Sequence, residues 1–376
     1  MVCGLRVLLI AGTSSIHTIR WAAGIHKAGA EVFLATQHGF IEPLKDDIGV
    51  HRLPFKGNIG YFLNGIGIRS FVDRIKPDIV NVHYASGYGT TARILNYHPY
   101  VLSIWGSDIF DFPDKSRLHK KLVRGNLMSA DAVASTSHCM ALQARKIAPS
   151  LGEIAITPFG VDVEAFLYNK EAIEKVEKSQ YLVVGTVKVL AFKYGIDTLI
   201  YTFAQTVEKL QIEMPEIVQF LRLRIVGDGP DRAELESLAC TLGIGGLVQF
   251  VGRVAHSQVP RELDKMDIFV ALSRLDSESF GVAVVEAGAA GRPVVVSDAG
   301  GLPEVVRDGE TGLVVPREDP VSAADALIKL IKDRNLRIRL GQNGRQHVIK
   351  NYSWNHCIDN MISLYEKTIF NYKSSK

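Results

Sequence analysis

Short apolar runs alternate with amphipathic stretches throughout the first half of the chain. The apolar runs lie at residues 5–10, 31–35, 79–82, 100–104 and 132–135. An amphipathic stretch at 18–27 separates the first two runs, which is the pattern of a β-α-β unit. Strands that alternate with helices form a parallel sheet that is covered on both faces and binds ligands at the carboxyl ends of its strands. The pattern predicts an α/β domain over residues 1–167.

The second half of the chain repeats this alternation more regularly. Its apolar runs lie at residues 182–184, 222–226, 248–251, 268–272, 293–297 and 312–315. The stretches that predict helices lie at residues 195–209, 231–242, 282–290 and 320–334. A polar segment at 168–178, rich in Lys and Glu, separates the two halves. We therefore expect a second doubly wound α/β domain over residues 178–350, joined to the first by a linker.

Length and composition agree with two soluble domains. At 376 residues, the chain exceeds the ~250 residues at which single hydrophobic cores stop growing. Its 47% of hydrophobic residues is enough to bury large cores. No apolar run reaches the ~18 residues that span a bilayer, and the four cysteines show neither zinc nor redox spacing. We expect a cytoplasmic protein with reduced thiols and no metal site.

The positive charge of the chain is small overall but locally dense. A net charge of +3 is too low for a general nucleic-acid binder. One segment nevertheless carries many basic residues between leucines, and these residues are Lys115, Arg117, His119, Lys120, Lys121 and Arg124. A helix here would be basic and partly amphipathic, so two interpretations stand: contact with an anionic membrane surface, or a solvated helix face.

The segment with the densest chemistry follows the apolar run at 268–272 and contains Glu278, Gly281 and Glu286. Gly281 is expected to open a helix and to let a phosphate approach the free backbone N–H groups there. Glu286 lies inside an otherwise apolar helical segment, where an unpaired carboxylate would be costly. We expect it to accept hydrogen bonds from the hydroxyl groups of a ribose. The alternative is a helix cap and an incidental salt bridge.

Several turns of the second half follow strands and are rich in glycine. They lie at residues 226–230, 252–253 and 299–304. Each turn alone is weak evidence, because turns need glycine for steric reasons. Their common position at strand ends favours one shared binding edge. Lys188 and Lys193, in the loop after 182–184, are candidates to bind a diphosphate, against the alternative that each is solvated.

Polar residues also follow strands of the first half. The turn at 12–17 contains glycine, but it lacks both the three-glycine dinucleotide fingerprint and the phosphate-loop motif, so neither NAD nor ATP is expected. His17 and His83 are candidate ligand-binding residues, against the alternative of structural histidines. Trp105 and Asp108 follow a later strand, and Asp108 is expected to face a cleft rather than the core.

These residues together resemble glycosyltransferase family 4, whose members are retaining enzymes with the two-domain GT-B fold. The resemblance rests on the two glutamates separated by seven residues, on the glycine-rich turns of the second half, and on the segment 158–162 of the first half. It covers nearly the whole chain. It implies two Rossmann-like domains that face a central cleft, with a C-terminal helix at about 352–372 that crosses back to the first domain.

The resemblance also implies roles for individual residues. Glu286 would bind the donor ribose, Glu278 would lie beside the transferred sugar, and Lys193 would contact the diphosphate. The candidate donor-binding residues are Gly12, Gly227, Gly252, Arg253, Ser279, Phe280, Gly281, Val282 and Glu286. The candidate catalytic residues are Glu278, Lys193, Lys188 and Asp108. The candidate acceptor-side residues are His17, His83 and Trp105.

Two positions depart from the family pattern. The family usually has an arginine directly after the glycine that corresponds to Gly185, whereas this chain has Thr186. Lys188 is expected to replace that arginine. Many relatives have a histidine where this chain has Trp105, which leaves the role of the loop around Asp108 open.

The family resemblance implies transfer, with retention, of a hexose or N-acetylhexosamine from a UDP-sugar to a glycan or lipid-linked acceptor in surface polysaccharide biosynthesis, and the basic segment agrees with a lipid-linked acceptor. The lysines and glutamates would stabilise the charges that develop on the diphosphate and on the sugar. The nucleotide-sugar is a substrate, so neither a cofactor nor a metal ion is expected. The expected location is the cytoplasm, at the inner face of the cell membrane. The alternatives are a nucleotide-sugar 2-epimerase and a non-catalytic nucleotide-sugar-binding partner.

Overall fold

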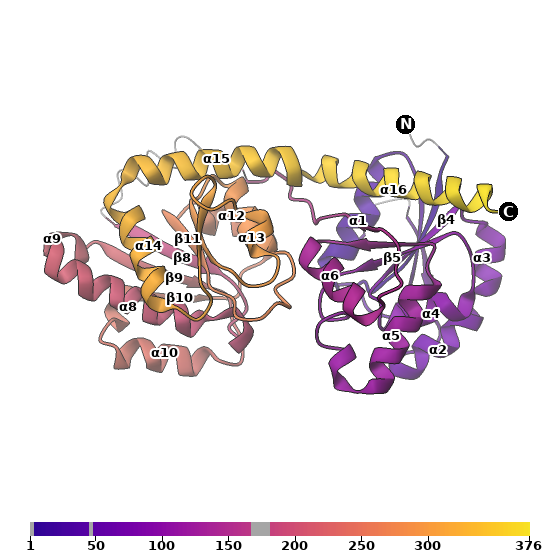
Figure 1. Ribbon diagram of the computed structural model, residues 1–376, viewed down its shortest axis with the longest axis horizontal. Helices are drawn as coiled ribbons and strands as arrows, with labels where there is room; N and C mark the ends of the chain where they lie inside the picture. Colours follow the sequence, from indigo (N-terminus) through magenta and orange to yellow (C-terminus); the bar gives the residue numbers. More distant parts are fainter. Residues whose placement is uncertain (1–3, 45–47, 167–180) are drawn as a thin grey trace. The chain divides into compact units, whose positions relative to one another are not determined.

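The structure, a computed structural model, describes residues 4–44, 48–166 and 181–376 (Figure 1). The chain divides into two compact units. Unit 1 comprises Met1–Gly160 and Trp354–Lys376, and unit 2 comprises Val161–Ser353. The linker expected at 168–178 lies outside the described residues.

Unit 1 contains a seven-stranded parallel sheet in the order β3-β2-β1-β4-β5-β6-β7. The strands are β1 (Arg6–Ile10), β2 (Glu31–Thr36), β3 (Gly49–Arg52), β4 (Ile79–His83), β5 (Tyr100–Ile104), β6 (Ala132–Ser135) and β7 (Ile154–Ile156). Every residue of β4 and β5 is buried, because these central strands are covered on both faces. The carboxyl ends of β1, β2, β4 and β5 meet at one edge of the sheet.

The helices of unit 1 are α1 (Ile16–Lys27), α2 (Gly57–Gly67), α3 (Arg69–Ile75), α4 (Gly87–Leu95), η1 (Pro113–Lys115), α5 (Arg117–Ser129), α6 (His138–Ile147) and α16 (Trp354–Ser374). The last of these, α16, packs on α1 at Gly24, where a Cβ would lie 2.6 Å from Ile358 Cδ1. The rings of Trp21 and Trp354 are 5.2 Å apart in the same contact. None of the helices in the described part of the chain is long and apolar enough to span a bilayer.

Unit 2 contains a six-stranded parallel sheet in the order β10-β9-β8-β11-β12-β13. The strands are β8 (Leu182–Val187), β9 (Leu221–Val226), β10 (Val248–Gly252), β11 (Ile268–Ala271), β12 (Val294–Ser297) and β13 (Gly312–Val315). The loops that follow β8, β9, β10 and β11 contain most of the residues that the sequence analysis selected. Because the strands are parallel, all four loops emerge at the same edge.

The helices of unit 2 are α8 (Ile196–Glu213), α9 (Pro215–Val218), α10 (Arg232–Thr241), α11 (Val259–Leu263), α12 (Val282–Ala289), α13 (Leu302–Val305), α14 (Pro320–Lys332) and α15 (Arg334–Tyr352), with short turns η2 (Phe192–Tyr194), η3 (Gly245–Leu247) and η4 (His256–Gln258). Most residues of α12 are buried. A Cβ on its Gly288 would lie 2.9 Å from Val348 Cγ2 of α15, so a small residue lets the two helices approach closely.

Candidate active site

Glycines set the conformation of the loop between β11 and α12. Gly281 precedes α12 with a φ of +86°, and a Cβ there would lie 2.5 Å from Leu302 Cδ2. A Cβ on Gly300 would lie 2.3 Å from the carbonyl oxygen of Glu278. The N–H of Gly301 donates to that same oxygen over 3.0 Å. These close approaches fix the backbone of Glu278 and the start of α12, since larger residues would push the two loops apart.

Glu278 is 8% exposed, and the protein holds one of its two carboxylate oxygens. Lys188 Nζ donates to Oε2 over 2.8 Å, and Ser273 Oγ donates to the same oxygen over 3.3 Å. The other oxygen, Oε1, has no hydrogen-bond partner among the described residues and is not one of their fully buried unpaired atoms. Glu278 therefore combines a fixed, charge-paired oxygen with a second oxygen that a ligand can reach.

Glu286, in α12, is 5% exposed and has the same division between its oxygens. Its Oε1 is 2.7 Å from Nε2 of His256, which lies in η4. Its Oε2 has no partner within the described part of the chain and is likewise absent from the fully buried unpaired atoms. The buried carboxylate thus has a protein partner that the sequence did not indicate, and it keeps one acceptor oxygen open.

Lys188 and Lys193 lie in the loop between β8 and α8, and both contact the ring of Tyr194. Their Nζ atoms are 4.7 Å and 4.8 Å from the ring centroid. Lys188 also pairs with Glu278, whereas Lys193 has no acidic partner in the ranges that the structure describes. The face of an aromatic ring attracts a cation electrostatically. Two ammonium groups therefore converge on one ring beside Glu278.

Arg274, which the sequence analysis did not select, ties this loop to the one that contains Glu278. Its guanidinium donates to the carboxylate of Asp197 and, over 2.9 Å, to the carbonyl oxygen of Phe192. Its backbone N–H donates to the carbonyl oxygen of Lys193 over 2.9 Å. The side chain is only 9% exposed. Arg274 thus fixes the backbone of Lys193. No local sequence motif indicates this role of Arg274, because its partners are distant in sequence.

The strands β9 and β10 end in glycines with positive φ. Gly227 has a φ of +136°, Gly252 has a φ of +87°, and the N–H of Gly227 donates to the carbonyl oxygen of Gly252 over 2.9 Å. A Cβ on Gly227 would lie 1.8 Å from the carbonyl oxygen of Lys188. Arg253 follows directly and is exposed, without an ion-pair partner among the described residues. These strand ends therefore meet the backbone of Lys188 at one edge of the sheet.

Thr186, where the family usually has an arginine, is completely buried, and its Oγ1 has no hydrogen-bond partner among residues 4–44, 48–166 and 181–376. Lys188 lies two residues further on, and its Nζ reaches Glu278. Lys188 therefore supplies a positive charge that Thr186 cannot.

In unit 1, His17 and Trp105 belong to one aromatic cluster. His17 stacks on Phe159 with ring centroids 4.2 Å apart, and the ring centroids of His17 and Trp105 are 6.2 Å apart in a T-shaped arrangement. The ring of Trp105 is 4.1 Å from that of His83 and 5.2 Å from that of Tyr84. The side chain of Trp105 is 8% exposed. The cluster brings together residues that follow β1, β4, β5 and β7, as expected for the carboxyl edge of a parallel sheet.

His83 is buried, which corrects the expectation that it faces a ligand. It is 1% exposed, with Nε2 3.0 Å from Asn81 Oδ1 and Nδ1 3.4 Å from Thr18 Oγ1. The amide nitrogen of Asn81 donates to Ser103 Oγ, so Asn81 Oδ1 is the acceptor and His83 Nε2 carries the proton. Burial, and to a lesser extent the neighbouring His17, lower the pKa of His83 to about 3. His83 is therefore a neutral structural residue.

Asp108 is also buried, and the expectation that it faces away from the core is wrong. It is 1% exposed, and its Oδ2 accepts the N–H of Ala85 over 2.7 Å. Its Oδ1 accepts the N–H groups of Trp105 and Gly106 over 3.1 Å and 2.9 Å. Burial raises the pKa of Asp108, while these hydrogen bonds oppose the rise. The carboxylate turns inward because it satisfies backbone donors that the end of β5 leaves unpaired.

His38 and Tyr88 form a polar pair beside Gly12 that the sequence analysis missed. A Cβ on Gly12 would lie 3.5 Å from His38 Nδ1, an ordinary contact that requires no glycine. His38 Nδ1 is 2.7 Å from the hydroxyl of Tyr88, which also accepts the N–H of Gln37. The same hydroxyl lies 3.3 Å from Thr36 Oγ1, so it can donate its proton either to that oxygen or to His38 Nδ1. Burial lowers the pKa of His38 and favours its neutral form. The detectable signal was the polar Gln37-His38 pair that follows β2.

Most of the chain matches two family models. Residues 169–347 match the family described as glycosyl transferases group 1, and residues 6–137 match the family described as glycosyl transferase 4-like. The chain belongs to glycosyltransferase family 4. It is therefore an enzyme of the hexosyltransferase class. The 2-epimerase alternative finds no support in these comparisons.

Two relatives illustrate the breadth of this glycosyltransferase family. N-acetyl-alpha-D-glucosaminyl L-malate synthase of Bacillus anthracis is 25% identical over 80% of this chain and 77% of its own. A GDP-mannose-dependent alpha-(1-6)-phosphatidylinositol monomannoside mannosyltransferase of Mycobacterium tuberculosis is 31% identical over 52% of this chain and 51% of its own.

Solved structures establish that the glycosyltransferase has the GT-B fold, with two parallel-sheet Rossmann-like domains. Sucrose-phosphate synthase from Thermosynechococcus elongatus superposes with a TM-score of 0.80 at 20% identity, over 96% of this chain and 98% of that one. HepE from Anabaena, in complex with UDP, superposes with a TM-score of 0.79 at 17% identity, over 96% of this chain and all of that one.

Proposed function

We propose that this glycosyltransferase transfers a hexose or N-acetylhexosamine from a UDP-sugar, with retention, and that Glu278, Glu286, Lys188 and Lys193 bind the donor. The observation that carries the proposal is the pair of buried glutamates, each with one oxygen held by the protein and one open. The choice of uridine is supported by HepE, which was solved with UDP. The GDP-mannose dependence of one relative makes the base the first point to test.

Glu286 is the proposed ribose-binding residue. A carboxylate oxygen accepts the O–H donors of a vicinal diol, and Oε2 is the oxygen that His256 leaves open. Glu286 lies in α12, and the first backbone N–H groups of this helix have no partner within the helix. We assign the phosphates to this helix start, with Ser279, Phe280, Gly281 and Val282 around them.

Lys188 and Lys193 are the proposed partners of the diphosphate. Cleavage of the bond between sugar and diphosphate builds negative charge on the leaving group, which cations held in place stabilise. Lys193 carries a charge with no acidic partner among the described residues, and Lys188 can bridge Glu278 and the leaving group. The open Oε1 of Glu278 is then the group beside the sugar, where positive charge develops. Retention is proposed on the family resemblance.

The proposed acceptor is a glycan or lipid-linked glycan precursor of a surface polysaccharide, at the inner face of the cell membrane. The Mycobacterium tuberculosis relative is named for a phosphatidylinositol mannoside, which is a lipid-linked acceptor. In this chain, α5 carries four Lys and Arg residues and no acidic residue. His17, Trp105 and His38 are the proposed acceptor-side residues, because aromatic rings and a neutral imidazole suit a sugar.

Thermal unfolding with UDP, GDP and ADP tests the donor assignment. A nucleotide that binds only the folded chain raises the melting temperature, by about 5–10 °C at roughly 100 times its Kd. We expect the largest rise with UDP, and we expect Glu286→Gln to abolish most of it. Glu234→Gln, at an exposed position of α10, is the matched control and should leave the rise unchanged.

A glycosyl transfer assay with the preferred UDP-sugar then tests Glu278. Glu278→Gln should lower kcat by at least about 100-fold with little change in the UDP-induced rise, because it alters the group beside the sugar. Equal rises for all three nucleotides, or a Glu286→Gln variant that responds like the original chain, would contradict the assignment.

A further inference from the structure

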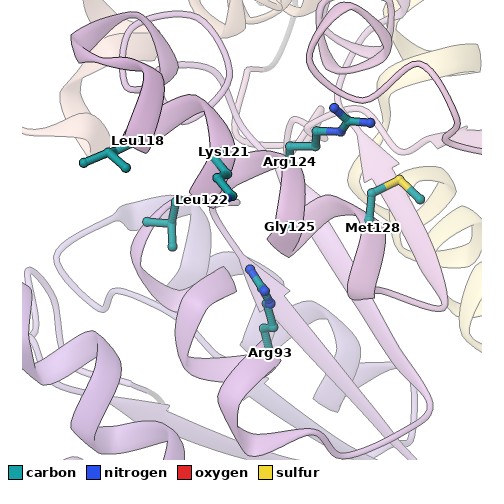
Figure 2. A pocket seen from close by; sticks show the side chains of 7 residues that line it. All are labelled: Arg93, Leu118, Lys121, Leu122, Arg124, Gly125 and Met128. Carbon is teal, nitrogen blue, oxygen red and sulfur yellow. The ribbon is translucent and has the colours of Figure 1, made fainter.

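A groove with a volume of about 510 Å³ runs between α4 and α5 in unit 1 (Figure 2). Arg93 enters it from α4, and Figure 2 shows its side chain rising toward α5. The other lining residues, all in α5, are Leu118, Lys121, Leu122, Arg124, Gly125 and Met128. Positively charged groups and apolar side chains therefore share one hollow.

The three cations of the groove have no counter-ion within the described part of the chain. Arg93, Lys121 and Arg124 are exposed and make no salt bridge or hydrogen bond with any residue that the structure describes. A Cβ on Gly125 would lie 2.1 Å from Nη1 of Arg93, so the guanidinium rests on the backbone of α5 in space that a larger residue would fill. Unpaired cations gathered in this way create a local positive potential that attracts an anion.

Exposed apolar side chains continue from the groove across α4 onto α2. Leu118 is 78% exposed and Met128 is 45% exposed. α2 packs on α4, with Gly65 against Ile94, and it exposes between 41% and 72% of its large apolar residues Ile59, Phe62, Leu63 and Ile66. No residue of α2 is charged. On α4, Ile94 is 37% exposed. We call the groove, the four apolar residues of α2 and Ile94 the docking face; Figure 1 shows its three helices side by side.

We propose that the docking face binds an anionic phospholipid bilayer, with a lipid phosphate in the groove and the apolar side chains of α2 at the acyl boundary. The inference rests on the proposed lipid-linked acceptor, and it names the surface by which the enzyme reaches it. A bilayer offers phosphate and hydrocarbon together. A nucleic acid would neutralise the cations but leave the apolar face of α2 in water.

Co-sedimentation of the full chain with vesicles tests the charged part of the docking face. We expect binding to vesicles of phosphatidylcholine and phosphatidylglycerol at low salt, and weak binding to phosphatidylcholine alone. The triple variant Arg93→Gln, Lys121→Gln, Arg124→Gln should bind about 100-fold more weakly, at about fivefold for each cation. A control variant loses the same charge from exposed positions of unit 2 and should bind normally; its substitutions are Lys329→Gln, Arg339→Gln and Lys350→Gln.

The double variant Ile59→Gln, Ile66→Gln tests the apolar part. These side chains are exposed, so their replacement should leave the fold intact. Salt screens the charges, so at high salt this variant should bind about tenfold more weakly than the original chain. Ile212→Gln, Val321→Gln, at exposed positions of unit 2, is the control.

Three outcomes would overturn the docking proposal: normal vesicle binding by the groove variant, equal losses in a variant and its control, or tighter binding of duplex DNA than of vesicles.

The UDP-induced rise in melting temperature is measured on the same variants. An unchanged rise in a variant that has lost vesicle binding confirms that it is folded. Vesicle binding by a chain that does not respond to UDP would refute the donor assignment and leave the docking face standing.

Discussion

Glu278 and Glu286 are buried to a similar degree, but their partners give them different chemistry. Lys188 places its ammonium group 2.8 Å from one oxygen of Glu278, so the two charges compensate each other. His256 offers Glu286 one directional hydrogen bond and is 33% exposed. A directional bond fixes the plane of a carboxylate, which suits a group that has to meet two hydroxyl groups at once.

Replacing His256 by alanine should weaken donor binding more than it slows the chemical step. The bond to Glu286 Oε1 involves a charged acceptor, and such bonds contribute about 1.5–3 kcal/mol, so the KM for the donor should rise about tenfold or more. We expect kcat to stay within about twofold, because ribose binding is equal in the ground and transition states. Steady-state kinetics measures both constants. His256→Gln keeps an N–H donor and should recover part of the affinity; a loss confined to kcat would argue against this role.

Acidification should destabilise the chain through His83. Its pKa is about 3 in the folded chain and near 6.5 when unfolded, so between these values only the unfolded state binds the proton. The free energy of unfolding should therefore fall by about 1.4 kcal/mol for each unit of pH below the upper value. Urea unfolding of the original chain and of His83→Gln, at several pH values, should show a shallower fall in the variant. Asp108, with its raised pKa, acts in the opposite sense in both chains, so a variant with an unchanged slope would refute the assignment to His83.

The sequence indicated the glutamates and lysines of the site but not the residues that hold them. Glu278 and Lys188 are 90 positions apart, and Glu286 and His256 are 30 positions apart. Lys188 meets Glu278 because β8 and β11 are neighbours in the sheet. His256 meets Glu286 because the segment after β10 and the helix after β11 lie at the same edge of the sheet. Local patterns reveal neither arrangement. At Asp108 the sequence indicated a residue of the site that is in fact buried. An aspartate at a strand end has the same local sequence whether its carboxylate faces a ligand or accepts backbone N–H groups.

At the scale of elements, the loops of unit 2 pack backbone against backbone, and glycine makes this possible. Gly227 and Gly195 each place the position of a Cβ within about 2 Å of a carbonyl oxygen from another loop. Both have positive φ, which adds conformational strain for any larger residue. The backbone of Lys188 can therefore lie against the neighbouring turn because Gly227 has no side chain.

Gly227→Ala should distort the site and destabilise unit 2. The new Cβ would overlap the carbonyl oxygen of Lys188, and strain and overpacking together should cost about 3 kcal/mol. We expect a clear loss of the UDP-induced rise in melting temperature, since Lys188 has to move. Gly246→Ala is the control, because Gly246 has no other atom within 4 Å of its Cβ position and no positive φ. Similar behaviour of the two variants would show that the close approach is unimportant.

Elements with a strong apolar signal were predictable, and those without one were not. The expected runs fall within β1, β2, β4, β5 and β6 of unit 1, whose residues are mostly buried. The edge strand β3 was missed because its residues are half-buried or exposed and show no alternation. The helix α2 was missed because it holds four glycines and no charged residue, so it lacks the polar face that marks a helix in sequence.

The whole molecule consists of two units, one continuous in sequence and one not. Unit 2 is the single stretch Val161–Ser353, whereas unit 1 is completed by Trp354–Lys376. The buried residues of α16 include Ile358, Met361 and Tyr365, and the hydroxyl of Tyr365 donates to Asn81 Oδ1 over 3.1 Å. Asn81 also accepts from His83, so the last helix closes the polar network at the centre of unit 1.

Truncation after Ser353 should unfold unit 1 and spare unit 2. The truncation exposes the face of α1 around Trp21 and removes apolar side chains that contribute about 1.5–3 kcal/mol each, a sum that exceeds the usual stability of a domain. Calorimetry should show one unfolding transition where the full chain shows two, or a single transition of reduced enthalpy if they overlap. Removal of residues 373–376 is the control. A truncated chain with unchanged unfolding enthalpy would contradict the role assigned to α16.

The alternation of apolar and amphipathic stretches predicted both α/β units, because each sheet is built from regular β-α steps. The alternation did not predict where α16 packs. Its amphipathic pattern predicts that one face is buried but not against which partner, and only the family resemblance pointed to the first domain. A contact between residues more than three hundred positions apart is determined by the tertiary structure.

The membership of α16 in unit 1 also has a consequence for biosynthesis. A ribosome releases the first residues of unit 1 long before it makes the helix that covers them, while all of unit 2 is synthesised in between. Trp21 and Gly24 therefore stay uncovered until α16 has been made, and unit 1, whose synthesis starts before that of unit 2, is completed after it. During that interval the nascent chain exposes an apolar surface that a chaperone can recognise.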